Sequence, residues 1–222
     1  MWNSFQPGNS SKRLRSEIAY GSLLVYSPRG TSEVCKQSRD ICYKVKAGDS
    51  ATLQLVARRL REHVDRRDVL ADLFAPDLTL VPMPRSAPLV SGALWPSDKI
   101  AQELLGVGLG SQIVPILERT AAVAKSSHAG PGERPAVQQH FDSFRAHARV
   151  EASDRILVID DVVTKGATAL AAVSRLAETY PRARIEVLAI IRTMGLVAEI
   201  ERILDPVTGR VLDIGGEARR EP

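Results

Sequence analysis

Hydrophobic positions follow their clearest pattern in the second half of the chain. Residues 156–159 form a continuous apolar run, which is typical of a strand buried on both faces of a parallel sheet. Between residues 170 and 180 the apolar positions recur at helical spacing, and residues 185–191 form a second apolar run. This succession of strand, helix and strand predicts an α/β fold with a central, mostly parallel sheet.

The first half of the chain shows shorter patterns of both kinds. Alternating segments predict an early antiparallel pair of strands, and a helical spacing predicts a helix capped by Asp49 or Ser50. Pro115 marks the last of the strand patterns as an edge strand, because proline cannot donate a backbone hydrogen bond. The strands are expected at 20–26, 40–46, 78–82 and 112–117, and the helices at 53–64 and 97–105.

Two stretches lack a sustained apolar pattern. Residues 120–149 contain several glycines and prolines, and a connection of this length is usually a functional lid or a disordered segment. Near the end of the chain, a last helix is expected at 196–204 and a turn at 205–209. The expected organisation is a flexible segment over 1–16, one domain over 17–204 with a lid loop at about 120–149, and a tail over 205–222.

Length and composition are those of an ordinary single-domain protein. Hydrophobic residues make up 44% of the 222 positions and charged residues 25%. The two cysteines, Cys35 and Cys42, stand seven residues apart, which excludes a zinc ribbon and a disulfide framework and favours a reducing cytoplasm. The longest apolar stretch, 185–200, is interrupted by charged residues, so no membrane-spanning helix is expected.

The net charge of +4 and the pI of about 9.3 favour an anionic partner, either a nucleic acid or a phosphorylated small molecule. The densest basic run interleaves with apolar residues at helical spacing, so it is interpreted as the solvated face of a helix. This run consists of Arg58, Arg59, Arg61, Arg66 and Arg67. Charge alone therefore does not distinguish the two kinds of partner.

Two adjacent aspartates, Asp160 and Asp161, stand where the apolar run at 156–159 leaves the sheet. Carboxylates are costly to bury without a polar or cationic partner, and a diol or a hydrated metal ion would supply one. The following segment, 164–168, leads into a helix whose first amide groups and dipole favour a phosphate. Gly166 lets the backbone approach a ligand closely. One loop can therefore hold sugar hydroxyls at one end and a phosphate at the other.

Over thirteen consecutive positions, 156–168, the segment resembles the 5-phosphoribosyl-1-pyrophosphate (PRPP) motif of the type I phosphoribosyltransferases. The shared features are an apolar strand, two acids, two apolar residues and a loop rich in threonine and glycine. The resemblance implies that the two acids bind the ribose hydroxyls, and that Mg²⁺ is carried near them by the pyrophosphate and the ribose, with no direct protein ligand. It assigns PRPP binding to Asp160, Asp161, Val162, Val163, Thr164, Lys165, Gly166, Ala167 and Thr168.

Two loop positions bear on how the motif would be used. Lys165 stands where the family more often has a small threonine or serine, and its ammonium either adds charge at the phosphate or points to solvent. Thr164 stands where members that act on 6-oxopurines usually have an aspartate. The resemblance therefore argues against hypoxanthine or guanine as the acceptor.

An earlier segment, 80–85, reads Leu-Val-Pro-Met-Pro-Arg and resembles the Val-Pro-Val-Pro stretch of ComF-type members of the family. The resemblance implies that Met83, Pro84 and Arg85 bind pyrophosphate, and a rigid proline turn with an exposed arginine is the alternative. Weaker likeness at 41–48 and 118–120 extends it over most of residues 20–195. The zinc-ribbon cysteines of many ComF-type proteins are absent.

The lid expected at 120–149 occupies the place of the family's flexible catalytic loop. Phosphoribosyl transfer passes through a cationic ribose while pyrophosphate leaves, so the useful groups are cations on the pyrophosphate and a lid that excludes water. Lys125 and Arg134 are therefore the expected catalytic cations, together with the two aspartates. The histidines of this stretch show no ligand spacing and are interpreted as surface or packing residues.

The sequence thus predicts a type I phosphoribosyltransferase fold with a small hood formed by the N-terminal strands and the C-terminal tail. The expected activity is transfer of phosphoribose from magnesium-bound PRPP to a nitrogen nucleophile, with release of pyrophosphate. The alternatives are a PRPP- or nucleotide-binding regulatory protein without transfer chemistry, and a ComF-like protein with a nucleic acid partner. For the aspartates alone, a ligand-free strand end or a response-regulator receiver are further alternatives. A cytoplasmic homodimer that binds PRPP and a small-molecule acceptor, and no membrane, is expected.

Overall fold

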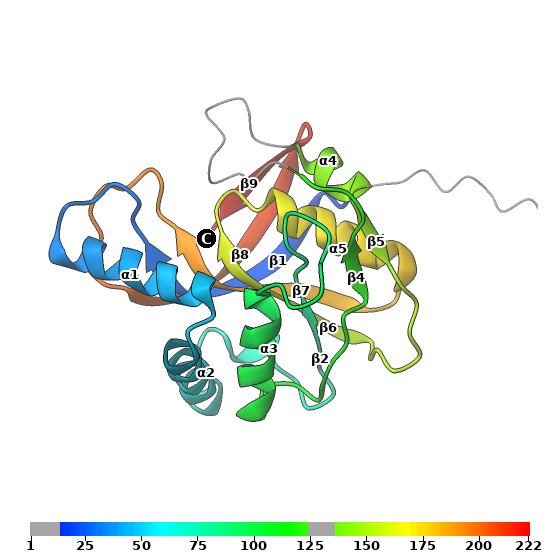
Figure 1. Cartoon of the computed structure of the whole chain (residues 1–222), viewed down its shortest axis with the longest axis horizontal. Helices are drawn as coiled ribbons and strands as arrows, with labels where there is room; N and C mark the ends of the chain where they lie inside the picture. Colours follow the sequence, from blue (N-terminus) through cyan, green and yellow to red (C-terminus); the bar gives the residue numbers. More distant parts are fainter. Residues whose placement is uncertain (1–13, 124–135) are drawn as a thin grey trace, which may run out of the picture.

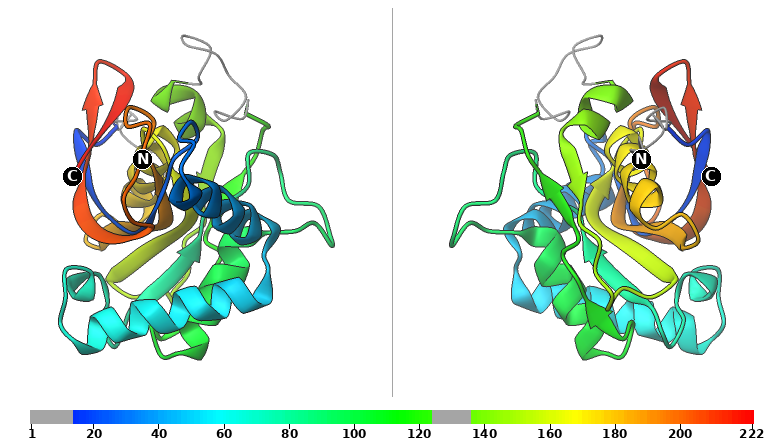
Figure 2. Two further views of the ribbon diagram at one scale, coloured as in Figure 1. Left: turned by 90° about the vertical axis from the view of Figure 1, so that its left-hand side faces the viewer. Right: turned by 90° about the vertical axis from the view of Figure 1, so that its right-hand side faces the viewer.

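A central sheet passes through the protein between layers of helices (Figures 1 and 2). The computed structural model describes residues 14–123 and 136–222. The elements in chain order are β1 (Glu17–Tyr26), α1 (Glu33–Ala47), α2 (Ser50–Asp65), a single 3-10 turn (Ala71–Leu73), β2 (Thr79–Pro82), α3 (Pro96–Gly106), β3 (Gln112–Ile113), β4 (Leu117–Arg119), α4 (Val137–Asp142), β5 (Phe144–Ala146), β6 (Arg155–Val163), α5 (Ala167–Thr179), β7 (Arg184–Thr193), β8 (Leu204–Ile214) and β9 (Glu217–Glu221).

The central sheet has seven strands in the order β3-β2-β6-β7-β1-β8-β9, and β4 and β5 form a separate pair. Neighbouring strands from β3 to β1 run parallel, whereas β8 and β9 are antiparallel. The expected α/β class, with a mostly parallel central sheet flanked by helices, is therefore confirmed. Because β2, β6, β7 and β1 are parallel, their carboxyl ends lie at one edge of the sheet.

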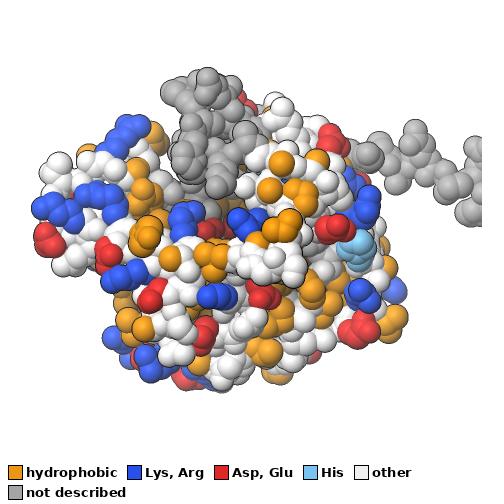
Figure 3. Space-filling view, in the orientation of Figure 1, with side chains coloured by type: hydrophobic (Ala, Val, Ile, Leu, Met, Phe, Trp, Pro, Cys, Tyr) orange, Lys and Arg blue, Asp and Glu red, His pale blue; other side chains and the backbone are white. Residues whose placement is uncertain are grey.

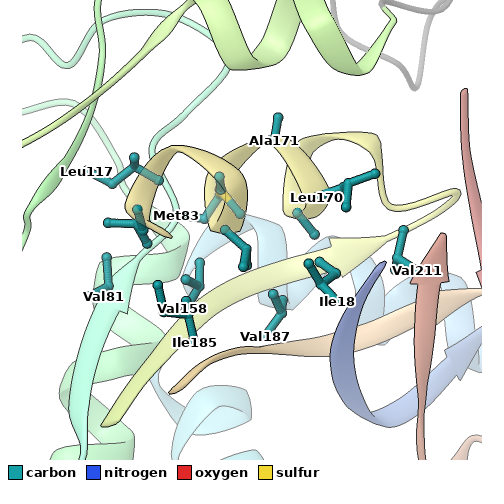
Figure 4. Packing of buried hydrophobic residues seen from close by; sticks show 14 of the residues in the cluster. Ile18, Val81, Met83, Leu117, Val158, Leu170, Ala171, Ile185, Val187 and Val211 are labelled. Atoms are coloured by element: carbon teal, nitrogen blue, oxygen red, sulfur yellow. The ribbon is translucent and has the colours of Figure 1, made fainter. Parts of the chain in front are cut away.

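Side chains that alternate along a strand pack against helices on opposite faces of the sheet. In β6, Val158 belongs to the same cluster as Leu170 of α5, and Figure 4 shows this layer beneath the helix. The preceding residue, Leu157, belongs to the cluster that contains Leu53 of α2 and Leu104 of α3. Burial on both faces explains why β6 is a continuous apolar run in the sequence.

Most of the expected elements are present. The side chain of Asp49 caps α2 by accepting a hydrogen bond from the Thr52 amide at 2.9 Å, as its position before the helix predicts. The pattern at 112–117 is divided at Pro115 into β3, which is an edge strand of the central sheet, and β4. The expected strands at 20–26, 78–82, 156–159 and 185–191 and the expected helices at 53–64, 97–105 and 170–180 correspond to β1, β2, β6, β7, α2, α3 and α5.

The expected strand at 40–46 is wrong, because these residues belong to α1. Ser32 caps the helix through its side chain, and Gly48 ends it in a left-handed conformation with a φ of 66°. The buried positions recur every three or four residues and are Cys35, Ser38, Cys42 and Val45. These caps and this spacing prevail over the short alternation of apolar residues, so the expected antiparallel hairpin does not form.

The expected helix at 196–204 is also wrong. The segment is irregular because its polar groups bind the loop that precedes α1. The carbonyl oxygen of Ala198 accepts a hydrogen bond from the Ser27 hydroxyl. The carboxylate of Glu199 accepts hydrogen bonds from the amides of Thr31 and Ser32, at 2.6 and 3.1 Å. Tertiary contacts thus take the place of helical hydrogen bonds.

The C-terminal segment forms strands in place of the expected turn and polar tail. β8 pairs with β1 and β9 pairs with β8, so residues 204–221 extend the central sheet. The two strands are joined by Gly215 and Gly216, whose φ values of 62° and 89° suit a tight hairpin turn. Gly209, expected in a turn, lies opposite Tyr20 in the sheet, where the backbone of Glu221 approaches closely.

Part of the stretch expected to be an irregular lid is regular. It contains the short helix α4 and the strand β5, which pairs with β4. Residues 124–135 lie outside the described residues, as do residues 1–13 of the expected flexible N-terminal segment. Within the two described ranges, no helix has the length and apolar character needed to cross a membrane.

Candidate functional site

A cleft of about 1520 Å³ opens at the carboxyl edge of the sheet, over the ends of β2, β6, β7 and β1. Basic and acidic side chains lie next to each other near the middle of the molecular surface shown in Figure 3. The residues predicted from the sequence that line the cleft are Met83, Pro84, Arg85, Asp160, Asp161, Val162, Thr164, Lys165 and Thr168. The structure therefore brings both expected motifs together in one cleft.

Other predicted residues do not line the cleft. Val163 is buried in the core beneath α5. Gly166 and Ala167 form the boundary at which α5 begins. The expected catalytic cations Lys125 and Arg134 lie outside the described residues.

The two aspartates share one small polar network. Asp160 accepts a hydrogen bond from the Asp161 amide at 2.9 Å, and Asp161 accepts one from the Val162 amide at 2.8 Å. The ammonium of Lys46, in the last turn of α1, lies 3.2 Å from Oδ2 of Asp161. Asp160 keeps some exposed surface, yet burial and then the charge of Asp161 raise its pKa well above the ordinary value. Asp160 is thus the carboxylate that most needs a polar ligand.

The loop after β6 is held from the opposite side by Arg220 of β9. The guanidinium donates hydrogen bonds to the carbonyl oxygens of Thr164 and Thr193, at 2.9 and 2.7 Å, and to the hydroxyl of Tyr20 at 3.2 Å. The hydroxyls of Thr164 and Thr193 lie 3.2 Å apart. The ends of β6 and β7 are therefore fixed beside each other before any ligand arrives.

Lys165 reaches towards β9. Its ammonium lies 3.5 Å from Oε2 of Glu217, and the two side chains are 56% and 79% exposed. An ion pair this exposed contributes little free energy and breaks easily. Lys165 and Glu217 both line the cleft. Lys165 is therefore able to leave Glu217 and turn towards an anion that binds there.

Gly166 is where the loop turns into α5, and its φ of 95° is one that L-residues rarely adopt. A Cβ atom at this position would lie 2.6 Å from Cγ1 of Val211, which is fully buried in β8. The loop thus passes directly over the core of the C-terminal hairpin, and only glycine fits there.

Replacing Gly166 with alanine is expected to lower the free energy of unfolding by about 1–3 kcal/mol, from the strained φ and the contact with Val211. Urea denaturation measures the loss. In a double-mutant cycle with Val211→Ala, the double variant should lose less stability than the sum of the single variants, because the smaller side chain relieves the contact. If the two losses in the free energy of unfolding were strictly additive, a steric contact between a Cβ atom at position 166 and Val211 would be contradicted.

Hydrogen bonds at Met83 and Arg85 hold the segment directly after β2. The Met83 amide donates to the Ile159 carbonyl at 2.8 Å, and the Trp95 indole donates to the Met83 carbonyl at 2.7 Å. Nε of Arg119 donates to the carbonyl oxygen of Arg85 at 3.0 Å. The guanidinium of Arg85 makes none of these contacts, so it is available to a ligand in the cleft that it lines.

Arg119, at the end of β4, is a cleft residue that lies in the stretch of weaker likeness at 118–120 but had no role predicted from the sequence. Its side chain is 3% exposed, stacks on the Phe144 ring at 3.9 Å and donates to the Ser143 hydroxyl at 2.5 Å. Burial lowers its pKa to about 10, although the charge of Asp160 acts in the opposite direction. Among the described residues no carboxylate pairs with it. A buried cation without a carboxylate favours an anionic ligand.

His140 of α4 lies beside this guanidinium and also lines the cleft. Its Nδ1 is 3.5 Å from Arg119, and burial together with the charge of Arg119 lowers its pKa to about 4. The imidazole is therefore neutral near pH 7. Within the described residues, its buried Nε2 has no hydrogen-bond partner.

Further cleft residues come from the two segments whose structure the sequence patterns did not predict. They are Arg39, Cys42, Tyr43 and Lys46 of α1, and Ile214, Glu217, Ala218, Arg219 and Arg220 of the C-terminal hairpin. The caps of α1 and the glycine pair at 215–216 were the available signals for these elements. For Arg119, the signal in the sequence was the weaker likeness at 118–120.

The cleft offers few protein ligands for a metal ion. Within the described residues, no group of three or more His, Cys, Asp or Glu side chains is placed to hold one. Asp160 and Asp161 could contact an ion that a ligand carries. No protein-family model matches this chain, and a search of curated proteins also finds no match.

Proposed function

We propose that the protein is a phosphoribosyltransferase of the type I fold, which transfers phosphoribose from PRPP to a nitrogen nucleophile and releases pyrophosphate. The observation that carries the proposal is the order of groups along the cleft. Residues 83–85 after β2, the aspartates of β6 and the loop before α5 lie on neighbouring parts of one sheet edge. This order matches the pyrophosphate, the ribose and the 5-phosphate of PRPP.

The ribose and the 5-phosphate are assigned to the two ends of the loop after β6. Asp160 and Asp161 accept hydrogen bonds from the ribose hydroxyls, which add polar partners for the partly buried Asp160 beyond the Asp161 amide. The first amide groups of α5 and the hydroxyl of Thr168 bind the 5-phosphate, with favourable help from the helix dipole. Lys165 adds a cation when it leaves Glu217.

The leaving group is assigned to the cations beside β2. Arg85 and Arg119 line this side of the cleft, and charge-assisted hydrogen bonds from them stabilise the pyrophosphate as it takes the electron pair of the broken C1–O bond. Mg²⁺, when bound, neutralises part of the pyrophosphate charge. The carboxylates of Asp160 and Asp161 fit near such an ion, although PRPP itself would supply most of its ligands.

The proposal predicts that PRPP binds in the presence of Mg²⁺ and that Asp160→Asn/Asp161→Asn removes the binding. Calorimetry measures the affinity, and steady release of pyrophosphate with a panel of nucleobases and amines measures transfer. Asp77→Asn is a matched control, because Asp77 is exposed and does not line the cleft. No binding of PRPP or of ribose 5-phosphate would overturn the proposal, and binding without release of pyrophosphate would instead indicate a regulatory protein.

A further inference from the structure

The strand order also locates the acceptor, provided that the proposed function holds. With pyrophosphate over β2 and the ribose over β6, a nucleophile that attacks C1 opposite the leaving group must come from the side of β7 and β1. In the parallel register Tyr26 lies beside Thr193, at the ends of these two strands. The acceptor is therefore expected at this end of the cleft, between the ends of β7 and β1 and the helix α1.

Apolar and aromatic surface lines this end of the cleft. It comes from Tyr26, Pro28, Tyr43 and Leu196. Tyr43 is 73% exposed and Leu196 fully exposed, so both present apolar surface that no part of the described chain covers. Flat side chains around an open space suit a planar ring, which can stack between them.

Two arginines line the same cleft, Arg29 on the loop before α1 and Arg39 on α1 itself. Arg39 donates through one nitrogen to the carbonyl oxygens of Ser27 and Gly30, at 3.2 and 2.8 Å, which fixes it against the loop before α1. Arg29 is exposed on the same loop. Neither arginine forms an ion pair with a carboxylate of the described residues.

The acidic residues of the cleft do not balance these cations. Among the residues that the structure describes, the acids that line the cleft are Asp160, Asp161 and Glu217. Asp161 pairs with Lys46, Glu217 pairs with Lys165, and Asp160 belongs to the ribose site. The end of the cleft beneath α1 therefore carries unpaired positive charge beside an apolar surface, which fits a ring that bears an acidic group.

We propose that the acceptor is a planar aromatic or heteroaromatic carboxylic acid. Its ring lies among Tyr26, Tyr43 and Leu196, and its carboxylate binds Arg29 and Arg39. The nucleophilic nitrogen forms a bond to C1 of the ribose as the bond from C1 to the pyrophosphate oxygen breaks. Pyrophosphate keeps the electron pair of that bond, and the proton of the nitrogen is released to solvent.

Matched pairs of acceptors test the class. Orotate and uracil, nicotinate and nicotinamide, and anthranilate and aniline each differ in the carboxylate. Binding is measured by calorimetry on the full chain loaded with Mg²⁺ and ribose 5-phosphate, and transfer by release of pyrophosphate from PRPP. At least one carboxylate is expected to bind ten-fold or more tightly than its uncharged partner. Equal or weaker binding of every carboxylate overturns the proposal.

Arg29→Gln tests the assigned contact, because Arg29 is exposed and its replacement is expected to leave the fold intact. The variant is expected to lose at least five-fold in affinity for the carboxylate and to bind the uncharged partner as before. Arg58→Gln makes the same change of charge on the exposed face of α2 and should change neither. Unchanged carboxylate binding by Arg29→Gln overturns the inference. PRPP binding in the same samples separates this failure from a failure of the proposed function, which would remove both.

Discussion

Replacing Asp160 with asparagine is expected to stabilise the free protein and, at the same time, to remove its affinity for PRPP. The carboxylate is partly buried and next to Asp161, and both effects raise its pKa. Asparagine keeps the oxygen that accepts the Asp161 amide hydrogen bond, so the local structure should persist. The substitution removes a negative charge that partial burial and the charge of Asp161 disfavour, so the folded state becomes more stable.

Because the pKa of Asp160 is raised in the folded protein, the gain in stability from Asp160→Asn depends on pH. A carboxyl group whose folded pKa is raised contributes stability that is fully present below its unfolded pKa of about 3.9 and is lost as the pH rises through the folded pKa. The free energy of unfolding of the wild type should therefore decrease relative to that of Asp160→Asn as the pH increases above about 4. A difference of about 1 kcal/mol would separate the two melting temperatures by roughly 2–4 °C.

A thermal melt with and without ligand measures both consequences. PRPP with Mg²⁺ at about 100 times its Kd should add roughly 2.7 kcal/mol to wild type and almost nothing to Asp160→Asn, so the order of stability reverses. Asp161→Asn should lose affinity without the gain in stability, because it breaks the ion pair with Lys46. Full ligand stabilisation of Asp160→Asn would contradict the assignment of this residue to the ribose.

The central part of the fold could be predicted because its signals are local. β6 and β7 are continuous apolar runs, and α5 has its apolar positions at helical spacing, so each element is visible in a short window. The motif at 156–168 lies between them and was placed correctly at a strand end before a helix. The residues of one loop need no distant contacts to be recognised.

The rest of the cleft depends on contacts between distant segments. Glu199 satisfies the amides at the start of α1, about 170 positions away, and so the segment around it does not form the expected helix. Arg220 fixes the loop after β6 from the last strand of the sheet. Periodicity within a window carries no information on such partners, which is why α1 and the hairpin of β8 and β9 were missed.

Arg119 is the residue whose removal should most clearly separate the two ends of PRPP. Arg119→Met keeps the stem that stacks on Phe144 but removes the charge, and it leaves the carbonyl oxygen of Arg85 without this donor. Affinity for pyrophosphate should fall by about 10- to 100-fold, the loss expected for one charge-assisted contact of roughly 1.5–3 kcal/mol. Affinity for ribose 5-phosphate should not change, because its contacts lie at Asp160 and the loop before α5.

Competition binding with pyrophosphate and with ribose 5-phosphate measures the two affinities in the same variant. Because no described carboxylate pairs with Arg119, Arg119→Met should melt within a few degrees of wild type, which rules out unfolding as the cause. Arg119→Lys keeps a charge but cannot reach Arg85 and Ser143 with the same planar donors, so it should recover only part of the lost affinity. A parallel loss of both ligands would mean that Arg119 supports the whole cleft through packing. A loss confined to pyrophosphate would place the leaving group beside β4, and C1 of the ribose would then face the tyrosines and arginines beneath α1.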